Sequence, residues 1–317
     1  MSKKVDVLIL GGGPAGLAVA GGLARQLHTG IVFSSGSFRN GAASHMHNVP
    51  GWDHEDPVKF RAKSRADILA RYSTIQFRDV GITGVKKLEG GGFEAVDDAG
   101  ERYEGRKIVL ANGIQDIMPQ IPGYSELWGK GIFHCLFCHG YEERGSSSAG
   151  LIASGLLGNT MFAPSIARMA NRLAGAVNVY TDGNEALGAE IRIALKSTKK
   201  FHVENRKIKS LAKDHDVQGE AGVLVTLDDG TINKEGFLAH APEFKLNSSF
   251  ADELGVDLAP QGHINALPPF FSTNVPGVFA AGDCATLLKS VPTATMMGSF
   301  VAAGLAHTLQ AEDDVEE

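Results

Sequence analysis

The chain has 317 residues, a length that predicts about two domains. Hydrophobic residues make up 43% and charged residues 21%, as in a globular protein with a sizeable core. With 30 basic and 36 acidic residues the net charge is −6, so no basic surplus supports nucleic-acid binding. No apolar run reaches the about 18 residues that a membrane span needs, and three cysteines are too few for a disulfide scaffold. We therefore expect a cytoplasmic protein in a reducing compartment, with no membrane or nucleic-acid partner.

The first third of the chain predicts a strand, a glycine turn, a helix and a second strand. An apolar run over 5–10 is followed by a helix over 17–27 and a strand over 31–33. Residues 39–57 contain three histidines and predict a long loop. A helix over 57–72 and strands over 75–77, 93–96 and 107–110 follow.

A second strand–turn–helix–strand unit begins in the middle of the chain, with strands over 151–154 and 177–180 and a helix over 164–174. The end of the chain predicts a strand over 277–281, a Gly-Asp turn, a helix over 293–309 and a frayed acidic tail over 311–317. These elements indicate an α/β protein with two Rossmann-like domains. We expect a discontinuous first domain, 1–114 with 243–317, around an inserted domain, 115–242.

A dinucleotide fingerprint occupies the first turn. Gly11-Gly12-Gly13-Pro14-Ala15-Gly16 lies between a strand and a helix, where glycines and a helix N-terminus bind a pyrophosphate. An acidic residue for the ribose is expected about 20 residues later. The second strand instead ends in Ser34-Ser35, whose hydroxyls are the candidate ribose contacts.

Cys135-Leu136-Phe137-Cys138-His139 contains one C-x-x-C, a spacing that closes a short disulfide. A redox-active pair is the preferred interpretation. The alternatives are part of a zinc site, c-type haem attachment because His139 follows, and a buried structural pair. Haem attachment would need an exported or organelle-targeted chain, and a second pair of zinc ligands is absent, so we predict no metal. Cys284 is expected to be a packed small side chain.

Two resemblances to known families add to the evidence from these motifs. Val278-Phe279-Ala280-Ala281-Gly282-Asp283 resembles the second signature of FAD-binding flavoprotein reductases, which implies FAD contacts at Gly282 and Asp283 and at Thr293 and Ala294 in the next helix. Together with the glycine turn and the C-x-x-C, it resembles the low-molecular-weight thioredoxin reductase family over nearly the full length. Cys135 to Gly145 and His45 to His54 are similar to the dithiol oxidases of the gliotoxin and holomycin type within that group.

What these resemblances imply is an FAD enzyme that closes the disulfide of a small-molecule dithiol of secondary metabolism and passes electrons to O₂. They imply a homodimer and add Arg39 and Asn48 to the cofactor-binding residues. Cys135 is then the thiol attacked by substrate, and Cys138 is the flavin-side thiol. His139, which stands where the wider family has an acidic Asp, is the preferred base, with His134 a weaker candidate. The sequence does not place His45, His47, Trp52 or His54.

The second nucleotide turn separates oxidase from reductase. It is Gly155-Leu156-Leu157-Gly158-Asn159-Thr160, with Leu157 at the second glycine position, where we expect its side chain to obstruct a pyrophosphate. Asp182 and Glu185 follow the next strand, where a 2′-phosphate would need arginines. We therefore expect that NADPH does not bind. The alternatives are an NADPH-dependent thioredoxin or disulfide reductase and a non-catalytic flavin-bound sensor.

Overall fold

The computed structural model describes residues 3–196 and 199–316 and divides the chain into two compact units. Unit 1 contains the described residues of 1–41, 49–115 and 244–317, and unit 2 contains those of 42–48 and 116–243. The predicted division kept 42–48 in the first domain, whereas the structure groups this segment with unit 2. No helix among the described residues is both long and apolar enough to cross a bilayer.

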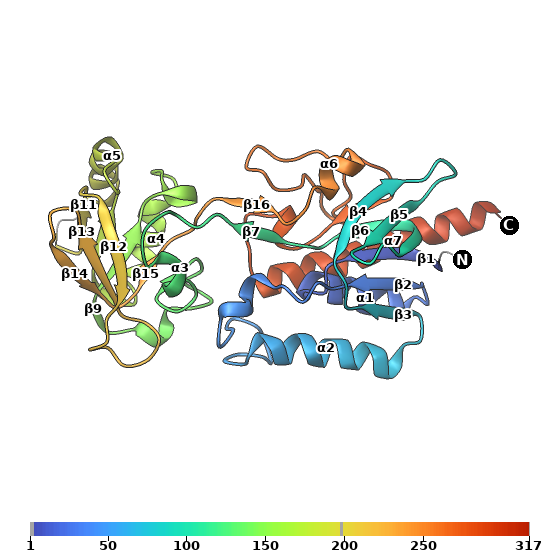
Figure 1. The fold of residues 1–317 in the computed structure, drawn as a ribbon, viewed down its shortest axis with the longest axis horizontal. Helices are drawn as coiled ribbons and strands as arrows, with labels where there is room; N and C mark the ends of the chain where they lie inside the picture. The colour runs from blue at the N-terminus through green and yellow to red at the C-terminus, as the bar shows by residue number, and fades with distance from the viewer. Residues whose placement is uncertain (1–2, 197–198, 317) are drawn as a thin grey trace. The chain divides into compact units, whose positions relative to one another are not determined.

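Unit 1 is built on a seven-stranded sheet in the order β3-β2-β1-β6-β5-β4, with β17 also paired to β6 (Figure 1). Its elements are β1 (Lys3–Leu10), α1 (Pro14–Arg25), β2 (Gly30–Phe33), a 3₁₀ turn (Arg39–Ala42), α2 (Pro57–Arg71), β3 (Ile75–Arg78), β4 (Ile82–Lys87), β5 (Phe93–Asp97), β6 (Arg102–Leu110), β7 (Ile114–Asp116), β16 (Phe244–Leu246), α6 (Phe250–Leu254), β17 (Val278–Ala280), a 3₁₀ turn (Asp283–Ala285) and α7 (Val291–Glu316).

The centre of this sheet is parallel, because β1 pairs in parallel with both β2 and β6. The middle of β1 is fully buried at Val7, Leu8 and Ile9, as the continuous apolar run predicts for a strand covered on both faces. β5 pairs with the first half of β6 and β17 with its second half, so the sheet joins the two ends of the chain.

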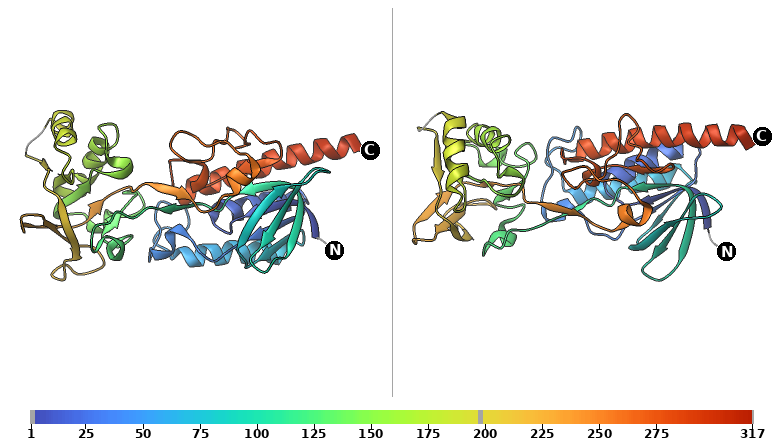
Figure 2. Two further views of the ribbon diagram at one scale, coloured as in Figure 1. Left: turned by 45° about the horizontal axis from the view of Figure 1, so that its top comes forward. Right: turned by 90° about the horizontal axis from the view of Figure 1, so that it is seen from above.

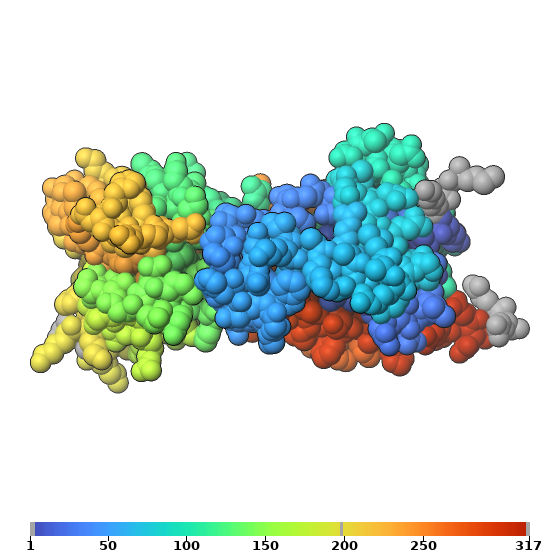
Figure 3. Space-filling view, turned by 90° about the horizontal axis from the view of Figure 1, so that it is seen from below, coloured from blue at the N-terminus to red at the C-terminus, as the bar shows by residue number. Residues whose placement is uncertain are grey.

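Helices α1 and α7 lie side by side (Figure 2). Their backbones approach closely, since a Cβ at Gly298 would overlap the carbonyl oxygen of Ala15 and one at Gly22 would overlap the Ala302 side chain. Helix α2 lies on the surface of unit 1 (Figure 3) and buries only Pro57, Arg61 and Ile68.

The prediction of a frayed tail is wrong for residues 311–316, and Glu317 lies outside the described residues. Helix α7 continues to Glu316 because acidic residues of its last turns meet basic residues of β6. Arg106 forms ion pairs with Asp313 at 2.7 Å and Glu312 at 3.2 Å, and Lys107 pairs with Glu312. Among the elements of unit 1, strands β4, β7 and β16 and helix α6 were not predicted.

Unit 2 contains a five-stranded parallel sheet, β11-β10-β9-β15-β8, and a three-stranded antiparallel sheet, β12-β13-β14. Its elements are α3 (Tyr124–Leu127), β8 (Ile132–Phe133), a 3₁₀ turn (Tyr141–Glu143), β9 (Ser146–Ile152), a 3₁₀ turn (Gly155–Leu157), α4 (Ala163–Ala170), β10 (Ala174–Tyr180), α5 (Glu185–Leu195), β11 (Phe201–Glu204), β12 (Ile208–Lys213), β13 (Val223–Leu227), β14 (Ile232–Glu235) and β15 (Leu238–Ala239).

This topology positions two motifs of unit 2. The cysteine pair follows the carboxyl end of β8, and the second nucleotide turn follows that of β9. Since β8, β15 and β9 run in parallel, both motifs leave the same edge of one sheet, where α/β proteins bind their ligands.

Candidate active site

The three glycines of the G-x-G-x-x-G fingerprint, Gly11, Gly13 and Gly16, have different surroundings in unit 1. Gly11 has a φ of +127°, and a Cβ there would overlap the carbonyl oxygen of Ala111. A Cβ at Gly16 would overlap the carbonyl oxygen of Gly11, so both positions require glycine for the turn itself. Gly13, the N-cap of α1, is different because, among the described residues, no atom beyond its own chain neighbours lies within 4 Å of where its Cβ would be. This open space beside the α1 N-terminus fits a dinucleotide pyrophosphate.

The carboxyl-terminal signature lies against the same turn. Gly282 has a φ of +83°, and a Cβ there would lie 3.1 Å from the Cβ of Ala15 and 3.7 Å from that of Ala294. Pro14 is the first residue of α1, and Ala15 is buried. The fold thus brings Ala15, Gly282 and Ala294 together, although Ala15 precedes the other two by more than 260 residues in sequence.

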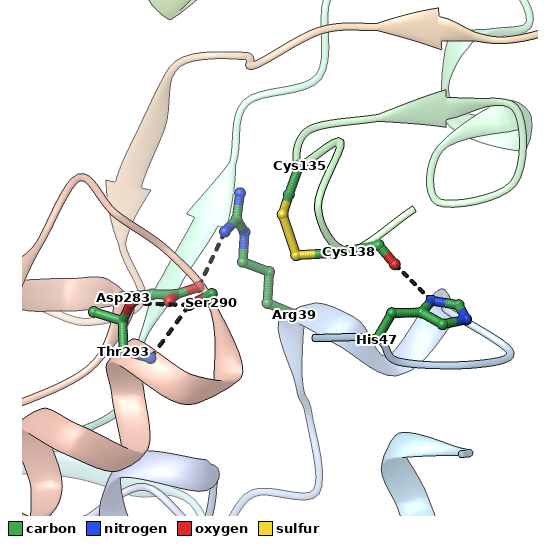
Figure 4. Close-up of a disulfide and its surroundings, with 7 residues drawn as sticks. All are labelled: Arg39, His47, Cys135, Cys138, Asp283, Ser290 and Thr293. Atoms are coloured by element: carbon green, nitrogen blue, oxygen red, sulfur yellow. Dashed lines mark hydrogen bonds and ion pairs between the residues drawn. A yellow bond between two sulfur atoms is a disulfide. The ribbon is translucent and has the colours of Figure 1, made fainter. Parts of the chain in front are cut away.

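Two charged residues predicted to bind the cofactor pair with each other. Arg39 donates from its guanidinium to a carboxylate oxygen of Asp283 at 3.0 Å (Figure 4). Both side chains are mostly buried, at 17% and 21% exposure. The Asp283 carboxylate thus offsets the Arg39 charge and holds its long side chain beside the Gly282 turn.

Helix α7 begins two residues earlier than predicted, with Ser290 as its cap. The Ser290 hydroxyl accepts a hydrogen bond from the Thr293 amide at 3.2 Å and lies 2.9 Å from the Thr293 hydroxyl (Figure 4). A serine accepting from the third helical residue is a usual N-cap, and Pro292 in the first turn supports it. Sequence reasoning missed Ser290, although its spacing to Pro292 was a usable signal.

Ser34 and Ser35 follow β2, and only Ser34 lies against the glycine turn. A Cβ at Gly12 would lie 2.7 Å from the Ser34 hydroxyl, whereas Ser35 is exposed. Asn48 has a φ of +59° and lies in the segment grouped with unit 2. The cofactor contacts of these three residues stay predictions.

In unit 2, Cys135 and Cys138 form a disulfide, in a turn just after β8 (Figure 4). The carbonyl of Cys135 accepts hydrogen bonds from the amides of Cys138 at 3.1 Å and His139 at 3.0 Å. Phe137, between the two cysteines, is 68% exposed, and it leaves an apolar ring in solvent beside the disulfide.

The His139 ring packs between two other rings. It stacks on Phe133, which is buried, with centroids 5.3 Å apart and an interplanar angle of 23°. His47 meets it edge-on with centroids 6.0 Å apart. Burial lowers the pKa of His139, with a further lowering by the neighbouring His47, while Glu142 and Glu220 act in the opposite direction. The neutral ring that results has the protonation state that a general base needs.

The long loop contributes a histidine that sequence analysis could not place. Nδ1 of His47 lies 2.7 Å from the carbonyl oxygen of Cys138, and Nε2 lies 3.3 Å from a carboxylate oxygen of Glu142 (Figure 4 shows the first contact). The contact of Glu142 with His47 has no signal in the sequence. His134 lies over Trp128, with centroids 5.9 Å apart.

Cys284 is fully buried, and its thiol donates to the Leu110 carbonyl at 3.3 Å. Burial raises the pKa of this thiol to about 12. It is therefore a packed side chain with negligible thiolate at neutral pH.

The expectation that Leu157 obstructs a pyrophosphate at the second nucleotide turn is wrong. Leu157 is 7% exposed and its side chain packs into the core of unit 2, so it does not project into the space for a pyrophosphate. Instead the Asn159 side chain accepts hydrogen bonds from the amides of Met161 at 3.0 Å and Phe162 at 2.9 Å, just ahead of α4. Amides that would bind an anion at this helix start are thereby used within the loop.

The region that would bind a 2′-phosphate also forms hydrogen bonds within the protein. The Asp182 carboxylate accepts a hydrogen bond from the Ile208 amide at 2.8 Å. Lys207 is the cation that sequence analysis overlooked, since a Cβ at Gly183 would lie 3.1 Å from its Cε. An acidic residue and a lysine therefore stand where the reductases are expected to have arginines.

Comparison with known proteins agrees with this geometry. A family model described as pyridine nucleotide-disulphide oxidoreductase matches residues 5–298. The chain belongs to this family. It is an oxidoreductase of the thioredoxin-reductase-like type, a group that is typically flavin-dependent.

Two curated relatives and one solved structure illustrate the likeness. Thioredoxin reductase aclD of Aspergillus oryzae is 43% identical over 306 residues, covering 96% of each chain. Thioredoxin reductase tcpT of Claviceps purpurea is 44% identical over 97% of this chain and 94% of its own. The crystal structure of an oxidoreductase from Agrobacterium tumefaciens is 30% identical, with a TM-score of 0.83 over 97% of this chain and 99% of that one.

Proposed function

We propose that the protein is an FAD-dependent dithiol oxidase that closes a disulfide in a small-molecule dithiol, with O₂ as acceptor and H₂O₂ as product. The observation that carries the proposal is the second nucleotide turn. Asn159 takes the amides ahead of α4, and Asp182 stands in the region for the 2′-phosphate. Without an NADPH site, electrons must enter from a thiol substrate.

The residues of unit 1 fit FAD. Gly11, Gly13, Pro14, Ala15 and Gly16 would hold the pyrophosphate, and Ser34 and Ser35 the ribose. Arg39, Gly282, Asp283, Thr293 and Ala294 complete the set proposed within unit 1 for the rest of the cofactor, and Asn48, which lies in the segment grouped with unit 2, stays a prediction from the sequence. Bound FAD would supply a two-electron acceptor that O₂ reoxidises.

The remaining chemistry belongs to the cysteine pair. A thiolate of the substrate attacks Sγ of Cys135, the disulfide breaks, and Cys138 leaves as a thiolate. The second substrate thiol then attacks the substrate sulfur of the mixed disulfide and releases Cys135. Two electrons and two protons pass from the dithiol to the pair. His139 is the proposed proton acceptor, and its neutral ring, which follows from a pKa lowered by burial, supports this role.

The substrate is proposed to be a small apolar dithiol of the epidithiodiketopiperazine kind, since Phe137 exposes an aromatic ring beside the disulfide. A homodimer and a role in secondary metabolism rest on the resemblance alone, and the proposed cytoplasmic location rests on the composition of the chain.

Anaerobic flavin absorbance tests the proposal. A small-molecule dithiol should bleach the flavin, and air should restore it with one H₂O₂ per dithiol oxidised. NADPH should leave it unchanged. Bleaching by NADPH at a comparable rate would instead favour a thioredoxin or disulfide reductase, which the names of the relatives and the position of Lys207 support. Flavin that neither reagent reduces would indicate a non-catalytic sensor.

A Cys138→Ser variant sharpens the test. In this variant Cys135 is a free thiol and the substrate has no disulfide to reduce, so dithiol-driven flavin bleaching should be lost. If Cys138→Ser is bleached as fast as the unmodified protein, Cys138 does not have the proposed role.

A further inference from the structure

The peptide group that joins Cys138 to His139 is held from both sides. Its N–H, from His139, donates to the Cys135 carbonyl at 3.0 Å, inside the turn. Its C=O, from Cys138, faces Nδ1 of His47 at 2.7 Å, from a segment 91 residues earlier in the chain. One peptide plane therefore sets the positions of both the proposed flavin-side thiol and the proposed base.

The orientation of His47 is itself well determined. A carbonyl oxygen only accepts, so Nδ1 carries the proton in this contact. On the other side of the ring, Nε2 faces the Glu142 carboxylate at 3.3 Å, and the side chain is 14% exposed. A histidine held between a carboxylate and a carbonyl in this way keeps one ring orientation.

The contact matters most when the pair is reduced. Reduction breaks the covalent link between Cys135 and Cys138, so the turn then depends on its hydrogen bonds. Those from Cys138 and His139 to the Cys135 carbonyl lie within the turn and can shift with it. The bond from His47 ties the turn to a different segment of unit 2, 42–48.

We propose that His47 is a positioning residue for thiol–disulfide exchange at Cys135 and Cys138. It holds the Cys138–His139 peptide so that the released thiolate and the His139 ring keep their places in both redox states. This proposal rests on the redox role proposed for the pair, and it applies to a dithiol oxidase and to a disulfide reductase alike. The exchange needs no further reactant, since the two electrons and two protons come from the dithiol.

Three variants of the full-length protein test it. His47→Phe keeps a ring but removes the donor, whereas His47→Asn places an amide N–H near the position of Nδ1. His202→Asn makes the same change at an exposed position on β11. Each protein is mixed anaerobically with dithiothreitol, quenched with an alkylating agent and analysed by mass for loss of the Cys135–Cys138 disulfide.

We expect His47→Phe to slow the exchange about tenfold, the loss that one hydrogen bond of this kind represents. His47→Asn should restore the rate to within about twofold of the unmodified protein, and His202→Asn should have no effect. A merely structural role would not be rescued by the smaller amide.

Two results would overturn the proposal: His47→Phe reacting as fast as the unmodified protein, or His47→Asn reacting as slowly as His47→Phe. A pair in the unmodified protein that dithiothreitol does not reduce would overturn it as well. Because the exchange is followed without oxygen and without the flavin signal, failure of O₂ to reoxidise the flavin would refute the proposed oxidase alone.

Discussion

Replacing Gly13 with alanine should weaken flavin binding about ten- to a hundredfold while leaving the fold intact. Gly13 caps α1 with φ −78° and ψ −176°, extended values that alanine adopts without strain. Apart from the chain neighbours of Gly13, no atom in the part of the chain that the structure describes lies within 4 Å of the new Cβ, so the free protein has room for it. The same methyl occupies the space through which a pyrophosphate would approach the turn.

The size of the effect follows from the contacts that the methyl would block. A hydrogen bond from a backbone N–H to a phosphate oxygen involves a charged group and contributes about 1.5–3 kcal/mol. Loss of one such bond weakens FAD binding about ten- to a hundredfold, because 1.4 kcal/mol corresponds to about tenfold. The free energy of unfolding of the flavin-free protein should change by less than about 1 kcal/mol, the usual range for an N-cap exchange.

Gly21→Ala is the matched control. It makes the same change within α1, also with no atom within 4 Å of the new Cβ, and should slightly stabilise the helix. Flavin-free protein is titrated with FAD by fluorescence quenching, and thermal unfolding is followed in parallel. The reasoning fails if Gly13→Ala binds FAD as tightly as Gly21→Ala, or if Gly13→Ala unfolds before any FAD is added.

Three other predictions concern titration and the end of the chain. Because burial lowers the pKa of His139 from 6.5, the rate of dithiol exchange should stay constant as the pH falls to 6.5 and decrease only at lower pH. The His139→Gln variant should lack this decrease in rate. A decrease centred above pH 6.5 in the unmodified protein would contradict the prediction. Burial lowers the pKa of His240 to about 4, so the unfolded chain binds the extra proton and stability is lost as pH falls from 6.5 to 4, by about 3 kcal/mol. Urea unfolding of His240→Asn across this range should show a shallower pH slope, and equal slopes would refute it. Replacing Glu312 with Gln and Asp313 with Asn should lower the free energy of unfolding by less than about 1 kcal/mol, since both carboxylates are about half exposed. A fall in melting temperature equivalent to about 3 kcal/mol would show that the ion pairs with Arg106 stabilise the protein more than exposed pairs do.

Local sequence patterns predicted much of the backbone. The run at β1, the glycine turn and α1 were predictable because a parallel strand, a tight turn and a small-residue helix each leave a signal within about ten residues. Strand β4 and helix α5 were missed. β4 alternates weakly, with Val85 as its one buried residue, and α5 follows a turn whose Asn184 cap was not recognised.

The tail shows the limit of local reasoning. An acidic run at a chain end predicts fraying, since like charges repel and few contacts are available. In the structure, Arg106 and Lys107 of β6 meet that run. These partners lie about 200 residues away in sequence, and no local pattern reports them.

By itself the sequence determined the presence of a dinucleotide fingerprint, a cysteine pair with His139 beside it, and a second nucleotide turn that departs from its pattern. These are properties of neighbouring residues, and spacing along the chain is enough to show them. Only the tertiary structure decided that Leu157 packs inward while Asn159 takes the loop amides, and that His47 reaches the Cys138 carbonyl. Hydrogen bonds between distant segments depend on directions set by the whole fold, so composition and spacing carry no record of them.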